Sequence, residues 1–208
     1  MEYKDLNLKN KAHKHSYLFA GIAMIAITLV CWLVYLYWPA SVSDGIHDYS
    51  AKRDRQAILD IFEKDWYWMV EGDRNSFSPA KMLDTKSPKE ARYNPALRGQ
   101  EKIKVLLVNG KVGGFITYYK RKAYLGHVHL INVLSEHRGH GYANKLMRIA
   151  IDDLFSDPTI SMVKLAVRRN NQTAIKLYKR LGFFEMNDRE GSGDAITDFA
   201  LTRETYTK

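Results

Sequence analysis

The longest run of hydrophobic positions covers residues 17–38 and contains no charged side chain. About 20 apolar residues let a helix cross a bilayer, and terminal Trp and Tyr side chains are typical of the interface. The run exceeds the roughly 7 to 15 apolar residues of a cleaved signal sequence, which is one alternative; a buried core helix is the other. We predict a basic tail over 1–16, a transmembrane helix over 17–38 and a linker over 39–44.

After the linker, hydrophobic positions alternate between extended and helical spacing, so residues 45–208 are predicted to form one α/β domain. Asn109-Gly110 stands between two extended runs and predicts a tight hairpin. The polar stretch 71–100 is expected to be an irregular loop with a short helix near residues 80–83. The expected strands are 45–49, 103–108, 112–120, 123–133, one starting near 165, 183–186 and 195–202. The expected helices are 53–69, with Ile58, Phe62, Trp66 and Met69 on its apolar face, 143–154 and one starting after Asn171.

The net positive charge of the chain does not identify its binding partner. The chain has 32 Lys and Arg against 23 Asp and Glu, a net charge of +9. This excess suits an anionic cofactor, a membrane surface or a nucleic acid equally well. No zinc-finger spacing or basic groove interleaved with aromatic residues occurs, so we expect no nucleic-acid partner. The only cysteine, Cys31, lies in the apolar run, which rules out an intrachain disulfide.

A glycine-containing turn, residues 138–143 (RGHGYA), joins a predicted strand to a predicted helix. Gly139 and Gly141 have no Cβ, so an anion can approach the first N–H groups of the helix. These groups lack intrahelical partners and coincide with the positive end of the helix dipole. The turn therefore predicts a phosphate-binding site.

A second segment, residues 165–183, has the pattern of a short buried strand, an Asn-capped helix and a Gly stop. Taken with the glycine turn, it resembles the GNAT superfamily of acyl-CoA-dependent N-acyltransferases. The resemblance covers about residue 45 to the C-terminus. The residues that match the two family motifs are Arg138, Gly141 and Ala143 in the first, and Asn171, Ala174, Leu177, Tyr178, Gly182 and Phe183 in the second.

The resemblance implies a mixed, mostly antiparallel central sheet flanked by helices, direct acetyl transfer from acetyl-CoA, and no metal. It places the pyrophosphate on the glycine turn and the pantetheine arm beside the preceding strand, whose main-chain N–H faces the thioester oxygen. The donor-binding residues it implies are Val133, Leu134, Ser135, Arg138, Gly139, His140, Gly141, Tyr142, Ala143, Asn144 and Asn171.

The resemblance also suggests catalytic side chains. Tyr178 occupies the position whose phenol protonates the departing thiolate, although its helical spacing is equally typical of a core residue. His127 and His129 lie on one face of a strand and resemble the His-x-His of the serotonin N-acetyltransferases, so we assign them jointly as the base. The ribosomal-protein alanine acetyltransferases use a Glu where this chain has Ala166, which disfavours an acetyltransferase of that type.

The sequence thus predicts a single-pass, membrane-anchored N-acetyltransferase with three partners: acetyl-CoA, a primary amine of a small molecule or protein, and the lipid bilayer. The alternative is a membrane-tethered acyl-CoA-binding module without turnover. Lysines in the N-terminal tail favour a translocated domain, whereas the cytosolic supply of acetyl-CoA favours a cytosol-facing one, which we prefer slightly.

Overall fold

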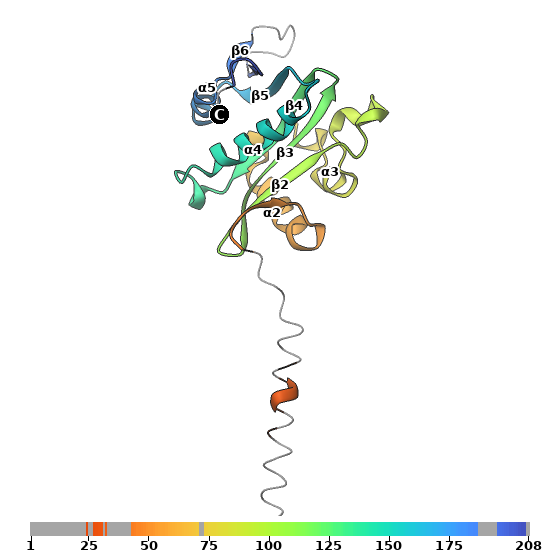
Figure 1. The fold of residues 1–208 in the computed structure, drawn as a ribbon, viewed down its shortest axis with the longest axis vertical. Coiled ribbons are helices and arrows are strands. Elements are labelled where there is room, and N and C mark those ends of the chain that lie inside the picture. Colours follow the sequence, from red (N-terminus) through yellow and green to blue (C-terminus); the bar gives the residue numbers. More distant parts are fainter. Residues whose placement is uncertain are drawn as a thin grey trace, which may run out of the picture. The chain divides into compact units, whose positions relative to one another are not determined.

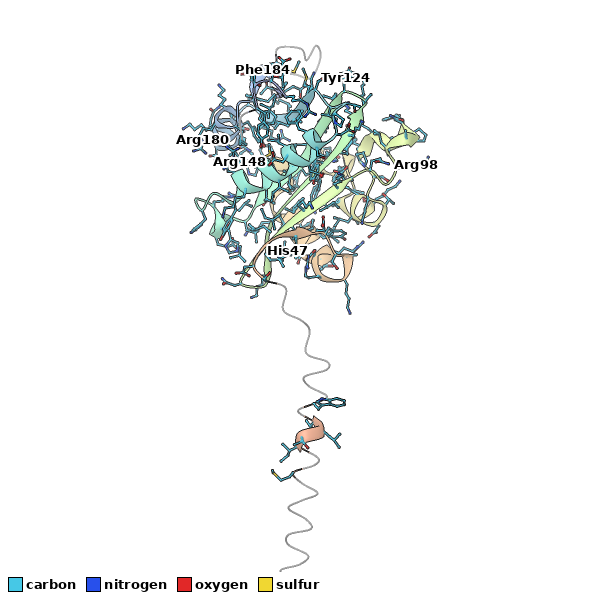
Figure 2. All side chains as sticks on the ribbon, viewed as in Figure 1. His47, Arg98, Tyr124, Arg148, Arg180 and Phe184 are labelled. Atoms are coloured by element: carbon cyan, nitrogen blue, oxygen red, sulfur yellow. The ribbon has the colours of Figure 1, made fainter. Side chains whose placement is uncertain are left out.

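The computed structural model describes residues 24, 27–30, 32, 43–70, 73–186 and 195–206. Figure 2 shows side chains on the ribbon. The chain divides into two compact units, Met1–Val42 and Ser43–Lys208. The predicted tail, residues 1–16, lies outside the described residues, as do 39–42 of the predicted linker. All structural features that follow belong to the second unit unless stated otherwise.

The predicted single-pass membrane location requires correction. Among the described residues, no helix combines the length and the apolar character needed to cross a bilayer. Most of the predicted span, 17–38, lies outside the described residues; Met24, 27–30 and Trp32 are helical and exposed. The membrane location, and with it the preferred membrane side, is withdrawn.

A seven-stranded mixed sheet forms the framework of the second unit (Figure 1). All neighbouring strands are antiparallel except β4 and β5, which are parallel. The strands in spatial order are β1 (Gly45–Asp48), β2 (Lys102–Val108), β3 (Lys111–Lys122), β4 (Leu125–Val133), β5 (Met162–Arg168), β7 (Ile196–Thr202) and β6 (Phe184–Met186). The predicted α/β fold with a mixed, mostly antiparallel sheet is confirmed.

Helices cover both faces of this sheet. On one face, Tyr118 and Val128 join the core that includes Leu146 of α4 (Tyr142–Ser156) and Tyr178 of α5 (Gln172–Arg180). On the other face, Tyr119 packs against Ala91 and Leu97. The remaining helices and single 3₁₀ turns are α2 (Ala51–Met69), η1 (Arg74–Ser76), α3 (Pro79–Thr85), η2 (Lys89–Arg92), η3 (Pro95–Leu97) and η4 (Ser135–His137).

Two local predictions about α2 and the hairpin can be compared directly with the structure. Asn109 and Gly110 connect β2 to β3 with φ of 52° and 71°, as a type I′ turn requires. Helix α2 starts two residues earlier than predicted and kinks at Asp65, whose φ and ψ are −118° and 16°. Ile58 and Phe62 before the kink are buried, whereas Trp66 after it is only half-buried. The predicted apolar face is therefore continuous only as far as the kink.

The parallel strands β4 and β5 are paired along only part of their length. Their register begins with Leu125 opposite Met162 and ends with His127 opposite Lys164. Beyond this point β4 continues to Val133 and β5 to Arg168 without a partner in each other. We call the region between these unpaired halves the seam.

Strand β4 contains one extra residue at the start of the seam. Leu130 pairs with Thr117 and Val128 pairs with Tyr118, so His129 between them has no counterpart on β3. Such a β-bulge bends its strand and increases the local twist. The bulge thus marks the place where β4 turns away from β5.

Candidate active site

The glycine turn has the backbone geometry that an anion site requires. Gly139 and Gly141 have φ of 84° and 77°, in the left-handed region that favours glycine, and a Cβ built on either would meet no atom within 4 Å. Gly141 is the N-cap of α4, and no side chain caps the helix. The first N–H groups of α4 therefore have no side-chain cap, which fits the pyrophosphate of an acyl-CoA.

The guanidinium of Arg138 makes hydrogen bonds within the protein. Nε donates to the main-chain oxygen of Val133 at 2.8 Å, and Nη2 donates to Asp65 Oδ2 at 3.2 Å. Asp65 also accepts from Asn132 Nδ2 at 3.0 Å. The positive charge of Arg138 is thus already paired, and the side chain links the end of β4 to the kink of α2.

The other predicted donor-binding residues lie along one continuous path from β4 into α4. Leu134 N donates to Gly113 O at 2.9 Å, and Ser135 begins the 3₁₀ turn η4. His140 is exposed, and its ring stacks on Tyr142 with centroids 5.9 Å apart. Ala143 and Asn144 are half-buried in the first turn of α4.

Helix α5 brings two predicted residues close to the core. Asn171 is its N-cap, and the side-chain oxygen accepts from Ala174 N at 3.2 Å. Tyr178 is 5% exposed and packs near the rings of Phe183 and Phe199 at 6.0 and 6.3 Å. Burial raises the pKa of the Tyr178 phenol, so the hydroxyl stays protonated throughout the neutral range. The burial of Tyr178 agrees with a role in the core. Its protonated hydroxyl also agrees with the proposed role as the acid, because it keeps a proton to donate.

The two predicted base residues are neighbours, as their strand spacing requires. The rings of His127 and His129 are 6.3 Å apart, and the ring of Tyr119 lies 5.4 Å from the first and 6.0 Å from the second. Phe77 packs edge-on against His129 at 5.4 Å. Both imidazoles are therefore half-buried among aromatic side chains at the start of the seam.

A buried carboxylate that sequence analysis missed accompanies this pair. Glu101 is 2% exposed, and Oε1 lies 2.9 Å from His129 Nδ1. Burial alone would lower the pKa of His129, but the charge and hydrogen bond of Glu101, with a smaller contribution from Glu90, raise it above the ordinary value. Glu101 follows the polar stretch that was expected to be an irregular loop, where no periodicity distinguishes it.

Arg168, the last residue of β5, lies at the far end of the seam and contacts the end of α2. Its guanidinium donates to the main-chain oxygens of Tyr67 and Val70 at 2.5 and 2.9 Å, and stacks over the Tyr67 ring at 4.0 Å. Since no basic residue stands in the last turn of α2, Arg168 supplies the cation that its C-terminus favours. Helix α2 is thus attached to β4 through Asp65 and to β5 through Arg168. Ala166, two residues earlier, is exposed.

A cavity of about 430 Å³ lies at the β1–β2 edge of the sheet, and Glu101 is one of its lining residues. Two of its lysines are already paired, Lys102 with Asp153 and Lys104 with Asp48, each at 2.7 Å. None of the predicted site residues lines it, so we place the chemistry at the seam. Within the described ranges, no group of three His, Cys, Asp or Glu side chains could hold a metal ion.

Comparisons with known proteins identify relatives of this chain. Residues 55–183 match the family model described as the acetyltransferase (GNAT) family. N-alpha-acetyltransferase 30 of Saccharomyces cerevisiae is 32% identical over 91 residues, which are 39% of this chain and 51% of that protein. The chain thus spans about half the length of this curated relative.

Two solved structures share the fold. Ard1 from Thermoplasma volcanium is 24% identical, with a TM-score of 0.57 over 77% of this chain and 98% of that one. The PaiA N-acetyltransferase from Thermoplasma acidophilum, solved with coenzyme A, is 16% identical, with a TM-score of 0.58 over 77% and 99%. At these identities the likeness concerns the fold. The family match carries the assignment: this chain belongs to the acetyltransferase (GNAT) family.

Proposed function

We propose that this protein transfers the acetyl group of acetyl-CoA directly to a primary amine of a small molecule or protein. The observation that carries the proposal is the meeting of two features at the carboxyl end of β4. One is the seam, where β4 and β5 separate, and the other is the bare glycine turn at the start of α4. A long ligand with an anionic end fits this combination.

Donor binding is assigned mainly to main-chain groups. The N–H groups of the glycine turn and of the first turn of α4 would hold the pyrophosphate. The unpaired edge of β4 near Val133 would hold the pantetheine arm, in the manner of an added strand. Asn171 is already used as a helix cap, so we give it a supporting role. The thioester supplies an activated acyl group; the protein orients it.

The acceptor must lose a proton before it can react, because alkyl amines have pKa values of about 10 and are cationic near pH 7. We assign this step to His127 and His129, directly or through water. When the amine nitrogen bonds to the acyl carbon, the carbon–sulfur bond breaks. The Tyr178 phenol then gives its proton to the sulfur, while the nitrogen loses its second proton through solvent, which restores the phenol.

A peptide N-terminus is a second candidate acceptor. The 32% identity to an N-alpha-acetyltransferase favours it, although over less than half of this chain. Ala166 argues against a base placed on β5, since methyl groups cannot accept protons. A protein of this class would therefore have to rely on the histidines of β4.

Acetyl-CoA turnover with a panel of amines tests the proposal. The panel should contain diamines, polyamines, amino sugars, arylalkylamines and short peptides with free N-termini. Release of free thiol, together with an acetylated product identified by mass spectrometry, is the expected result for at least one class. Tight acetyl-CoA binding without product from any amine would instead favour the alternative, a non-catalytic acyl-CoA-binding module.

A further inference from the structure

One ring nitrogen of His129 is already committed to a partner. Nδ1 lies 2.9 Å from Oε1 of Glu101, and the side chains of the two residues are 14% and 0% exposed. An ionised carboxylate can only accept a hydrogen bond, so Nδ1 must carry the hydrogen. In the neutral ring the lone pair is then on Nε2. The contact with Glu101 therefore selects one tautomer of His129.

Glu101 is held firmly in this position. Its main-chain N–H donates to Lys86 O at 2.8 Å, which fixes the chain just before β2. Its second carboxylate oxygen, Oε2, is buried without a hydrogen-bond partner among the described residues. A buried carboxylate that is only partly satisfied favours a positive charge beside it, because little solvent screens the attraction. An imidazolium at His129 would provide that charge.

We infer that Glu101 is the positioning residue that makes His129, acting through Nε2, the proton acceptor of the histidine pair. This inference rests on the function proposed above. In the step concerned, an N–H bond of the acceptor ammonium breaks and an Nε2–H bond forms, directly or through water. The nitrogen keeps the electron pair for attack, and the imidazolium remains paired with Glu101.

The charges around His129 agree in sign with this role. Glu101 before β2 and Glu90 of η2 favour the imidazolium, and Lys89 of η2 opposes it. Among the described residues, Tyr119 of β3 and His127 of β4 also place titratable rings beside it. Burial raises the pKa of the Tyr119 phenol, so this residue remains neutral. The carboxylates therefore outweigh the one lysine.

Nuclear magnetic resonance of the histidine side chains tests the pairing without any need for turnover. The ring ¹⁵N shifts of His129 should report the Nδ1–H tautomer at high pH and a pKa that falls in Glu101→Gln. The matched control is Glu90→Gln, which removes a nearby half-buried carboxylate that does not bond to His129; it should keep the tautomer and move the pKa less. An Nε2–H tautomer in the wild-type protein, or an unchanged pKa in Glu101→Gln, would overturn the inference.

Kinetics tests the consequence for catalysis. Glu101→Gln should lower the plateau of kcat/KM for the amine about 10-fold or more and move its acidic limb to lower pH, with the KM for acetyl-CoA unchanged. Glu90→Gln should stay within about 3-fold of wild type. Should Glu101→Gln fail to fold, Glu101→Asp keeps the charge on a shorter side chain and should lose less activity than His129→Gln. Equal losses in Glu101→Gln and Glu90→Gln would contradict a specific role for Glu101.

Failure of the broader proposal would look different. A wild-type protein that binds acetyl-CoA but acetylates no amine contradicts the proposed function. The side-chain shifts of His129 would still decide whether Glu101 fixes its tautomer.

Discussion

Arg138 and Asp65 stand 73 positions apart in the chain, and their side chains meet at 3.2 Å, Nη2 to Oδ2. The contact joins the glycine turn to the kink of helix α2. Because the same guanidinium also donates to Val133 O, it holds the last residue of β4 in place. Arg138 thus shapes the donor site by fixing main chain as well as by its charge.

This arrangement predicts different effects for two substitutions at Arg138. Arg138→Gln keeps a side-chain N–H that can reach Val133 O, so CoA affinity should fall by no more than about 3-fold. Arg138→Leu removes every donor, and a lost hydrogen bond of about 1.4 kcal/mol corresponds to a 10-fold weaker affinity. Calorimetric titration with CoA measures both. Equal losses would mean that charge, and not the bond to the main chain, is what matters.

Charge and bulk at Gly141 can be separated by a matched pair of variants. Asn and Asp have the same size and both tolerate a left-handed backbone, so Gly141→Asn and Gly141→Asp should fold alike at φ of 77°. Gly141→Asn should weaken CoA binding by crowding, and Gly141→Asp should abolish it because a carboxylate repels phosphate. Equal affinities in the two variants, measured by calorimetry, would remove the pyrophosphate assignment.

Loss of the Tyr178 hydroxyl should affect turnover more than stability. Tyr178→Phe keeps the ring that packs near Phe183 and Phe199, so the Tm should change little. The kcat should fall about 100-fold, with acetyl-CoA affinity preserved, because only proton donation is lost. Stopped-flow turnover and thermal melts compare the two quantities. Normal turnover in a folded variant would establish Tyr178 as a core residue alone.

The His129–Glu101 pair should make stability depend on pH in a defined direction. The pKa of His129 is raised above 6.5 in the folded protein, where the contributions of Glu101 and Glu90 exceed the opposing effect of burial. The pair therefore stabilises the fold fully below about pH 6.5 and loses this contribution as the pH rises through the folded-state pKa. The Tm difference between wild type and His129→Gln should be larger at pH 6 than at pH 9. A difference that grows with pH would contradict the ion pair.

Arg168 should be worth more to stability than its sequence neighbour. Arg168→Ala removes two charged hydrogen bonds to α2 and the stacking on Tyr67, a loss of about 2 to 3 kcal/mol. Arg169→Ala removes one exposed ion pair with Glu185, worth no more than about 1 kcal/mol. Urea unfolding at fixed pH compares the two variants. Similar midpoints would mean that the attachment of α2 to β5 adds nothing to the fold.

Local signals in the sequence predicted local structure well. Asn109-Gly110 predicted the hairpin because both residues tolerate positive φ, and Asn171 predicted the start of α5 because its side chain accepts a main-chain N–H. The glycine turn was recognisable for the same reason. Each of these features is decided by residues close together in the chain.

Features that depend on distant contacts were missed. Glu101 meets His129 across 28 positions, and Asp65 meets Asn132 across 67. Neither carboxylate belongs to a pattern that distinguishes it from solvated acidic residues, and burial of a charge becomes visible only when its partner is in place. The kink at Asp65 was missed for the same reason. The apolar run at 17–38 satisfied a length criterion that no described helix meets.

The seam also separates the strands that come first in the chain from those that come last. Strands β1 to β4 all precede residue 134, and β5 to β7 all follow residue 161, so neither half of the sheet borrows a strand from the other. A cut in the turn after α4 therefore leaves every antiparallel pair intact. Two fragments made in this way would meet again through three parallel residue pairs, the packing of the shared core, and the hydrogen bonds of Arg168 to α2 and of Arg203 to Phe155 O at the end of α4. A ligand lying between β4 and β5 would touch both fragments, and their reassembly would then serve as a direct readout of donor binding.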